Sequence, residues 1–279
     1  MTDWMSDFAE FAREELPAES AERLIGLLRP AIQLSAAETG EIVVGRLGGV
    51  AKLPDDMAWP SLAEGSSPMS FVAELDCEEL ARHEVDITLP ETGTLLFFVT
   101  AGAHESRVIY VPHGTAVAER PVPDDRVEVY AELPLAAVTE PSWPSRSHPA
   151  LVDVFGSLQE AEEMVWDHVL DEDTLETFAD QLTLYEDGGR VGPPHQVGGY
   201  SDALQGPIEA VAAYAAGTGS YGDPAFQEEA RQWVTLLQVA EDARAGLIWG
   251  DGAYLIWGIR RDHLAARDFS KVHLDVQGH

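Results

Sequence analysis

The chain has 279 residues, of which 45% are hydrophobic, and its 49 acidic and 17 basic side chains give a formal net charge of −32. The apolar fraction is that of a globular core and excludes a wholly disordered chain. The negative field excludes nucleic acids and anionic membranes as partners, and no apolar run approaches the roughly 18 residues of a membrane span.

The compartment and the redox state follow from two local features. Residues 1–16 are acidic and amphipathic, without the basic start and continuous apolar core of a signal peptide. The single cysteine, Cys77, excludes an internal disulfide and disfavours a cysteine-based metal site. We therefore expect a cytoplasmic protein. The acidic excess has two interpretations, a surface that attracts a basic partner or a solvated surface that only keeps the protein soluble.

The first part of the chain predicts two helices followed by a β-meander. Apolar spacing predicts a helix over residues 3–16, and Pro17 begins a second helix that Pro30 stops. Asp76 is a candidate N-cap for a short helix over residues 78–83. Strands are expected at 31–34, 42–46, 69–75, 94–99, 107–111 and 127–132.

Residues 133–150 contain four prolines and are the best linker candidate in the chain. The interpretation is a single compact domain over residues 1–279, with possible halves at 1–140 and 150–279 joined by this segment. Further helices are expected at 157–170 and 172–185, followed by a long glycine-rich loop at 187–206 and by helices at 207–216 and from Pro224.

The C-terminal part predicts three strands at 233–239, 247–249 and 254–257, the last two joined by a Gly250-Asp251-Gly252 hairpin turn. A short helix at 262–267 and a strand at 269–276 follow. The predicted fold class is α+β, with mainly antiparallel sheets, a possible pair of pseudo-repeated β-rich halves, and helices packed around them.

An internal echo supports those halves. Gly48-Gly49 precedes a strand at 69–75 and one beginning at Gly93, whereas Gly198-Gly199 precedes a strand at 233–239 and one beginning at Gly252. The offsets are 198 − 48 = 150 and 252 − 93 = 159. This similar order of features indicates either a structural repeat or the ordinary recurrence of strands and turns in a β-rich chain. A repeat predicts that the two Gly-Gly loops lie near each other, with a ligand groove between them.

The 195–205 loop is the first choice for a ligand site, because polar groups gather there around flexible glycines. His195 could act as a general base or donate to an anion, or it could pair with backbone to hold the loop. The candidate ligand-binding residues are His195, Gln196, Gly198, Gly199, Tyr200 and Gln205, with Gly48, Gly49, Trp59, Trp249 and Asp251 from other segments. Trp59 and Trp249 could equally be core residues, and Asp251 could be only a turn residue.

Metal, cofactor and nucleophilic chemistry have no sequence support. The nine histidines form neither HExxH nor HxH, and no GxSxG occurs. Cys77 lies between Asp76 and Glu78, whose negative charges disfavour a thiolate. We expect no metal and no cofactor, and the sequence identifies no catalytic residue.

An ordered series of short segments runs from about residue 40 to the C-terminus. It comprises Gly48-Gly49, Leu53-Pro54, Trp59-Pro60, Pro68–Leu75, Leu89-Pro90, Gly93–Val99, His195–Tyr200, Leu204-Gln205-Gly206, Leu236-Leu237-Gln238, Trp249–Gly252 and Asp268-Phe269-Ser270. In this order the segments resemble the YwqG-like family of uncharacterised bacterial proteins, although Ala51 stands where a proline is expected. The resemblance implies an α+β fold without an established activity. It also implies an immunity-type or protein-binding role, because similar members are thought to occur beside bacterial toxin systems.

The leading functional hypothesis is a cytoplasmic protein-binding module whose acidic surface receives a basic partner. The alternative is a small-ligand binder or enzyme that uses the His195 loop and the groove beside Gly48-Gly49. A third interpretation is a scaffold domain without a ligand. Whether the protein is an enzyme stays open at this level.

Overall fold

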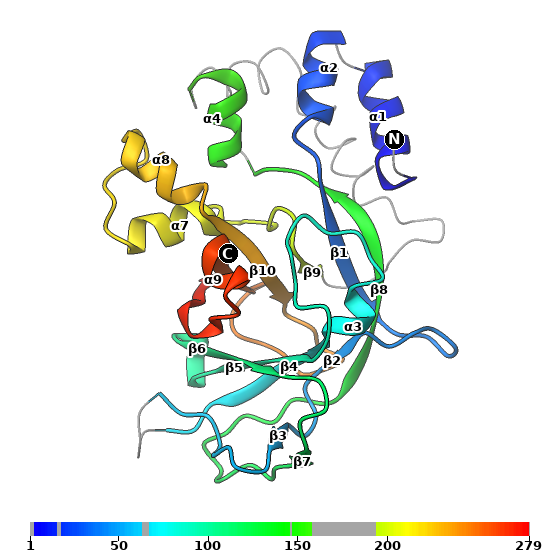
Figure 1. Cartoon of the computed structure of the whole chain (residues 1–279), viewed down its shortest axis with the longest axis vertical. Helices are drawn as coiled ribbons and strands as arrows, with labels where there is room; N and C mark the ends of the chain where they lie inside the picture. The colour runs from blue at the N-terminus through cyan, green and yellow to red at the C-terminus, as the bar shows by residue number, and fades with distance from the viewer. Residues whose placement is uncertain (1–2, 16–17, 63–66, 146, 158–193, 279) are drawn as a thin grey trace.

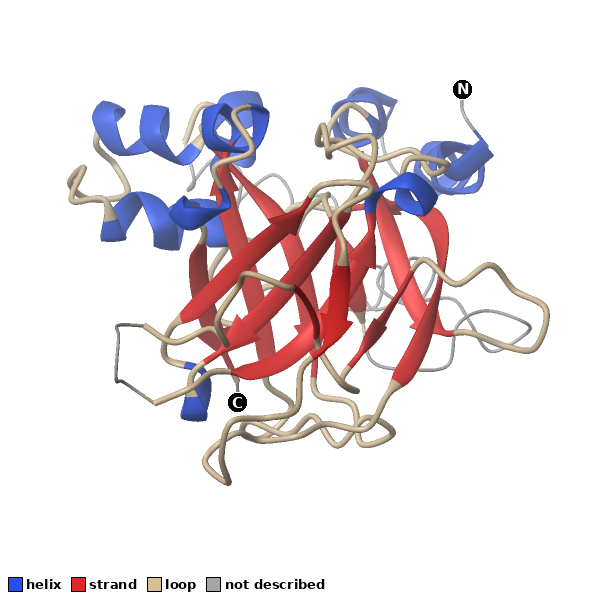
Figure 2. Cartoon of the chain, turned by 60° about the horizontal axis from the view of Figure 1, so that its bottom comes forward, coloured by secondary structure: helices blue, strands red, loops and turns tan. Residues whose placement is uncertain are grey.

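The computed structural model describes residues 3–15, 18–62, 67–145, 147–157 and 194–278. Ten of the described strands form one antiparallel sheet in the order β12-β11-β10-β9-β1-β8-β2-β4-β5-β6. The sheet curls strongly (Figure 2), and the apolar core lies inside the curve. This architecture confirms the predicted α+β class with mainly antiparallel pairing.

The elements have the following bounds. The sheet contains β1 (Arg29–Ala36), β2 (Gly45–Leu47), β4 (Ser70–Asp76), β5 (Thr94–Val99), β6 (Ser106–Val111), β8 (Leu133–Ser142), β9 (His195–Val197), β10 (Trp233–Ala240), β11 (Tyr254–Arg260) and β12 (His273–Gln277). A separate ribbon pairs β3 (Lys52–Pro54) with β7 (Val117–Glu119). The helices are α1 (Asp3–Glu15), α2 (Ala18–Ile25), α3 (Cys77–Leu80), α4 (Pro149–Phe155), α7 (Ile208–Ala215), α8 (Pro224–Ala230) and α9 (Arg261–Ala265), with 3-10 turns η1 (Ala101–Ala103) and η3 (Phe269–Lys271).

Helices and ribbon occupy opposite ends of the molecule. In Figure 1, α1, α2 and α4 lie at the top and α7 and α8 to one side, whereas β3 and β7 lie at the bottom. Helix α7 packs closely on β11, because a Cβ at Gly258 would lie 2.6 Å from Cγ1 of Ile208. The helices predicted at 157–185 lie outside the described residues, apart from Ser157.

The two halves of the sheet share one register pattern. Arg46 of β2 faces Glu74 of β4, and Gln196 of β9 faces Gln238 of β10. Two residues before each of these partners, the pairing with the next strand shifts register, at Val72 in β4 and at Leu236 in β10. A register shift at the same place in both halves indicates a structural repeat rather than a chance recurrence of strands and turns.

The middle of the sheet shows how the two copies are joined. Strand β8 pairs with β2, and β1 pairs with β9, while β1 and β8 pair with each other. The two copies are related about the Ser35–Ala136 pair, because Leu34 pairs with His195 of β9 as Leu135 pairs with Gly45 of β2. Strand β1 therefore completes the second copy, although it is the first strand of the chain, and β8 completes the first copy.

Equivalent residues of the two copies also meet in the core. Phe97 follows the register shift in the β4–β5 pair, where it faces Ala73, and Trp257 occupies the same place opposite Leu237. Their rings lie 5.2 Å apart, and both side chains are fully buried. The curl of the sheet thus brings its two outer parts face to face, and aromatic packing there contributes to the stability of both copies.

The proline-rich segment is not a linker. Residues 133–142 form β8, in the middle of the sheet, and α4 begins at Pro149. Pro141 faces Pro30 across the β1–β8 pair. Two prolines can face each other only where no hydrogen bonds are exchanged, and β2 and β9 do not extend to this rung. The prolines are therefore tolerated inside the sheet, and the predicted division into halves does not follow the repeat.

Other boundaries also differ from the predictions. Residues 127–132 are not a strand, and residues 247–249 contribute only an isolated bridge between Leu247 and Asp242. Strand β10 instead pairs directly with β11, and residues 241–253 form a long connection between them. Within the predicted strand at 42–46, regular pairing begins only at Gly45. The cap at Asp76 is confirmed, because its side chain accepts hydrogen bonds from the Glu78 and Glu79 backbone N–H groups.

Candidate functional site

Each copy of the repeat contains a Gly-Gly turn that one side chain holds in the same way. In the first turn (Arg46–Val50), the Arg46 guanidinium donates to Gly48 O at 2.6 Å and to Val50 O at 2.8 Å. In the second turn (Gln196–Tyr200), Gln196 Nε2 donates to Gly198 O at 2.7 Å and to Tyr200 O at 2.6 Å. The two turns are therefore equivalent structures, each closed by the side chain two residues before its Gly-Gly pair.

Both Gly-Gly pairs need glycine for their backbone angles. Gly48, Gly49, Gly198 and Gly199 have φ values of 57°, 79°, 66° and 64°, in the left-handed region that other residues avoid. The surroundings differ. A Cβ at Gly199 would meet Ser142 and Ala31. One at Gly49 would meet the ends of the Arg46 and Glu132 side chains first, and then Glu132 Cβ at 3.1 Å.

The two turns lie at opposite ends of the sheet, so the prediction that they share a groove is wrong. Gly49 lies against Glu132 at the start of β8, and Gly199 lies against Ser142 at its end. Ten residues of strand separate those contacts, roughly 30 Å. The second turn faces the helical end of Figure 1, and the first faces the β3–β7 end.

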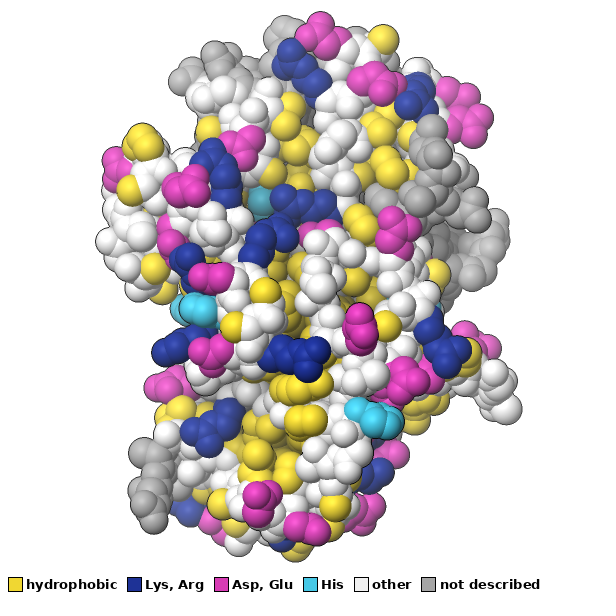
Figure 3. All heavy atoms as spheres, in the orientation of Figure 1, with side chains coloured by type: hydrophobic (Ala, Val, Ile, Leu, Met, Phe, Trp, Pro, Cys, Tyr) yellow, Lys and Arg dark blue, Asp and Glu magenta, His cyan; other side chains and the backbone are white. Residues whose placement is uncertain are grey.

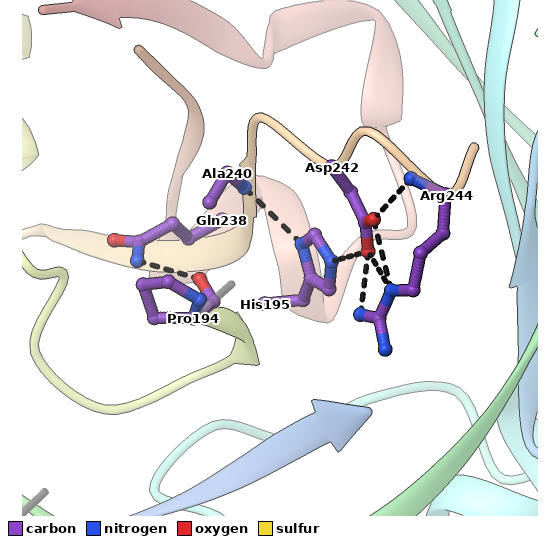
Figure 4. A network of polar contacts seen from close by, with 6 residues as sticks. All are labelled: Pro194, His195, Gln238, Ala240, Asp242 and Arg244. Atoms are coloured by element: carbon purple, nitrogen blue, oxygen red, sulfur yellow. Dashed lines mark hydrogen bonds and ion pairs between the residues drawn. The ribbon is translucent and has the colours of Figure 1, made fainter. Parts of the chain in front are cut away.

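His195, the first residue of the predicted ligand-binding loop, is fully buried and held on both ring nitrogens (Figure 4). Its Nδ1 accepts from the Ala240 N–H at 3.2 Å, which places the ring hydrogen on Nε2. Nε2 lies 3.3 Å from Asp242 Oδ2. Neither nitrogen is available to take a proton from a substrate in this arrangement, so His195 joins β9 to the connection after β10 instead of serving as a base.

Asp242 is the partner that fixes His195. Its carboxylate accepts 2.7 Å and 3.0 Å hydrogen bonds from the Arg244 guanidinium and a 2.8 Å bond from the Arg244 backbone N–H. Burial favours the neutral acid, but the His195 and Arg244 donors outweigh it and hold the pKa of Asp242 well below its usual range. The ion pair with Arg244 therefore persists at neutral pH.

The remaining polar candidates of the second turn also make internal bonds. Gln196 Oε1 accepts from Gln33 at 2.6 Å, so both ends of its amide are used. Gln205 N–H donates to Gln277 Oε1 at 2.9 Å, and Gln205 Nε2 donates to Gly278 O at 2.7 Å. These bonds tie the loop to the C-terminal strand, and they do not converge on His195.

Tyr200 fills the space beside the second turn. Its side chain is 3% exposed, the Arg29 guanidinium lies 4.2 Å from its ring centroid, and the His148 ring packs edge-on at 4.7 Å. Burial raises the pKa of Tyr200 to about 12. Asp86 accepts from the Gly199 N–H at 2.6 Å, and its other oxygen lies 3.8 Å from Arg29. The second turn is thus closed to solvent by an aromatic ring, a cation and a carboxylate.

The first turn is open at the same position. Val50 follows Gly48-Gly49 as Tyr200 follows Gly198-Gly199, yet it is 47% exposed. A cavity of about 230 Å³ lies beside it, lined by Gly49, Val50, Ala51, Trp59, Phe71, Arg120, Pro121, Val122, Val127, Glu128 and Val129. Two sequence candidates, Gly49 and Trp59, therefore meet at one pocket, which we call the open-turn pocket.

The open-turn pocket has aromatic lining residues and belongs to acidic segments of the chain. Trp59 donates from Nε1 to Met69 O at 2.9 Å and packs against Phe98, as Phe71 also does. Residues 52–56 and 117–132 carry seven acidic and three basic side chains. At this end of the molecule, hydrophobic and acidic side chains lie next to each other on the surface (Figure 3).

The last two sequence candidates belong to the β10–β11 connection. Asp251 is exposed there, and Trp249 packs edge-on against Tyr130 with ring centroids 6.3 Å apart. Glu241, which the sequence did not single out, accepts from the Trp249, Gly250 and Gly252 N–H groups. Burial favours its neutral form, but these donors outweigh that and lower the pKa of Glu241. The carboxylate that shapes this loop is therefore Glu241 rather than Asp251.

A second cavity lies between edge strand β6 and η3. Its volume is about 460 Å³, and Arg107 is the one charged side chain among the described residues that line it. Met57, Leu62, Ile109 and Phe269 supply apolar walls. No predicted site residue lines this cavity.

Metal and membrane features were also sought in the described parts of the chain. They contain no group of three or more His, Cys, Asp or Glu side chains arranged to hold a metal ion. They also contain no helix with the length and hydrophobicity needed to cross a membrane. Cys77 is buried, and burial followed by the Asp76 charge raises its thiol pKa to about 12.

Comparison with known proteins gives a family without a described activity. No curated protein matches the chain. A family model described as Domain of unknown function (DUF1963) matches residues 45–277, which include both Gly-Gly turns and every strand of the sheet except β1. The chain therefore belongs to the DUF1963 family.

Proposed function

We propose that the protein is a protein-binding module of the bacterial cytoplasm whose acidic surface receives a basic partner protein. The observation that carries the proposal is the net charge of −32, with 49 acidic side chains against 17 basic ones. Such a field accelerates encounter with cationic proteins and disfavours acidic ones. The resemblance to YwqG-like proteins adds an immunity-type role, in which the partner is a basic toxin.

The internal hydrogen bonds of the polar candidate residues favour binding over catalysis as the function. His195 and Gln196 make internal bonds at both ends of their polar groups. The open-turn pocket, in contrast, exposes apolar side chains beside Glu128 and Arg120, within segments that carry seven acidic and three basic side chains, a composition suited to a partner that is both apolar and cationic.

Affinity capture at two salt concentrations tests the proposal. The full-length protein is immobilised, exposed to lysate of its native host, and eluted first at low and then at high salt. An unrelated protein of similar size and pI serves as the control bait. We expect a basic protein, enriched over the control, that elutes only at high salt and whose purified form binds with a Kd that weakens steeply as salt rises. Equal capture by both baits, or a Kd unchanged by salt, would contradict the proposal.

The second candidate function is small-ligand binding or catalysis, which the sequence predicts at the His195 loop. The observation that favours it is the 460 Å³ cavity beside β6, whose volume falls within the range typical of ligand sites, about 300–1,000 Å³. Apolar walls with one arginine suit a small amphipathic carboxylate. Decanoate is a suitable probe. A rise in melting temperature that disappears in Arg107→Gln would support this function, and no rise would remove it.

A further inference from the structure

The open-turn pocket has the size of a single side chain. Its volume of about 230 Å³ is below that of typical small-molecule sites, about 300–1,000 Å³. Trp59 and Phe71 present aromatic rings to it, and Val122 and Val129 form an exposed apolar edge, 40% and 64% exposed respectively. A ring-shaped apolar group would bury the most surface in such a space.

The second copy of the repeat shows what occupies the equivalent place. There the residue after Gly-Gly is Tyr200, whose ring is covered by the Arg29 guanidinium at 4.2 Å. Asp86 lies 3.8 Å from that guanidinium and holds the glycine turn through the Gly199 N–H. An aromatic ring, an arginine and a carboxylate thus close one turn, whereas Val50 leaves the other turn open.

The carboxylates needed for the same combination are present around the open turn. Glu128 lines the pocket and accepts from the Tyr130 hydroxyl at 2.7 Å. Glu132 lies against Gly49, with one oxygen 3.4 Å from Arg46 Nη1. The nearby arginines are engaged elsewhere, since Arg120 donates to the main-chain oxygens of Pro54 and Asp55. Arg126 is paired with Asp124 at 2.6 Å. What the first turn lacks is an aromatic residue after its Gly-Gly pair and a guanidinium stacked on that ring, because its own Arg46 holds the turn carbonyls and lies 5.1 Å from the Phe71 ring centroid.

We infer that the open-turn pocket receives an aromatic side chain of the basic partner, with an arginine beside it that faces Glu128 and Glu132. This inference rests on the proposed function and names its docking surface. The partner supplies in trans what Tyr200 and Arg29 supply within the chain. We expect an interface with one aromatic anchor residue buried at its centre and charged side chains around it.

The test uses N-acetyl-Arg-Tyr-Arg-amide as the probe, titrated into the full-length ¹⁵N-labelled protein at millimolar concentration. We expect amide shifts at Gly49, Val50, Ala51 and Val129, and at least a tenfold weaker Kd for the Arg-Ser-Arg and Gln-Tyr-Gln peptides. Val50→Tyr and Val129→Tyr fill or cover the pocket and are expected to weaken binding at least tenfold. Val117→Tyr is the matched control, because Val117 is a 42% exposed valine of β7 that does not line the pocket.

The outcomes separate this inference from the proposed function. If the peptide binds all three variants, Val50→Tyr, Val129→Tyr and Val117→Tyr, with the same Kd, the docking site is wrong. Amide shifts that map to another surface would have the same meaning. Neither result would contradict the proposed acidic binding module. Capture of the basic partner by Val117→Tyr but not by Val50→Tyr would support both. Absence of any salt-sensitive basic partner would overturn the function itself.

Discussion

The first and second Gly-Gly turns have the same hydrogen-bond scheme and different surroundings. Arg46 and Gln196 close them with equivalent bonds, but Tyr200 is buried among charged groups, whereas Val50 borders an open cavity. The second turn has become part of the core, and the first has kept a free surface. Equivalent turns of one repeat can therefore differ in how far they belong to the core, and four pairs of variants test this difference.

The largest effect on stability is expected when the second glycine of each Gly-Gly pair is replaced by alanine. Gly199→Ala would place a Cβ 2.4 Å from Ser142 Oγ and 2.6 Å from Ala31 Cβ, in addition to strain at φ 64°. We expect a loss of about 3–5 kcal/mol in the free energy of unfolding. At Gly49 the nearest atoms are the movable ends of Arg46 and Glu132, with Glu132 Cβ at 3.1 Å, so Gly49→Ala should lose about 1–3 kcal/mol. Urea unfolding of both variants measures the difference, and equal losses would remove the distinction between the turns.

Tyr200→Val gives the second turn the residue of the first. The substitution leaves a buried gap under Arg29 and His148, and we expect a loss of about 2–4 kcal/mol. The reverse change, Val50→Tyr, is made at a half-exposed position and should stay within about 0.5 kcal/mol of the parent. Thermal and urea unfolding test the pair together. A Val50→Tyr variant that loses as much as Tyr200→Val would show that the first turn also belongs to the core.

Arg46 can be tested against its counterpart. Arg46→Ala leaves Glu74 without its 2.8 Å partner and frees two turn carbonyls. We expect a loss of about 2–3 kcal/mol, less than for a fully buried pair because Glu74 is 24% exposed. The double variant Arg46→Gln/Glu74→Gln recreates the Gln196–Gln238 arrangement and should recover at least half of that loss. No recovery in urea unfolding would mean that the two turns are held by different interactions.

The smallest effect concerns Asp86. Burial raises its pKa in the folded protein, so the ionised form opposes folding, increasingly as pH rises above the unfolded value of about 3.9. Asp86→Asn keeps an acceptor for the Gly199 N–H. We expect the difference in the free energy of unfolding between this variant and the parent to shift in favour of the variant by up to about 1 kcal/mol from pH 4 to pH 7. Asp86→Ala leaves that N–H buried and should lose about 1–3 kcal/mol. Urea unfolding of the parent and both variants at pH 4 and pH 7 tests this prediction. A stability change in Asp86→Asn that is the same at both pH values would contradict it.

Local sequence signals predicted the elements that local interactions form. The run Thr94–Val99 and the cap at Asp76 depend on neighbouring residues, and both predictions are confirmed. Strand β8 was missed because its prolines are tolerated only through the facing Pro30 and the short reach of β2 and β9. No composition rule contains that information.

The site residues show the same limit. His195 and Gln196 drew attention as polar residues of a glycine-rich loop, but their partners Asp242 and Gln33 are 47 and 163 residues away. Gly49 and Trp59 do meet at one pocket. Arg46 was missed, although a signal existed, since it precedes Gly48-Gly49 by the same spacing that separates Gln196 from Gly198-Gly199.

The placement of β1 has a consequence for the order in which the protein forms on the ribosome. Strand β1 is made early, but Gln33 meets Gln196 only after another 163 residues have been synthesised. Until then, one edge of β1 has no strand beside it and is open to pairing with another chain. Its side toward β8 is covered sooner, since Ser142 binds Arg29 O across 113 residues. The nascent chain thus passes through a stage in which the first copy can close while the second copy has only its final strand.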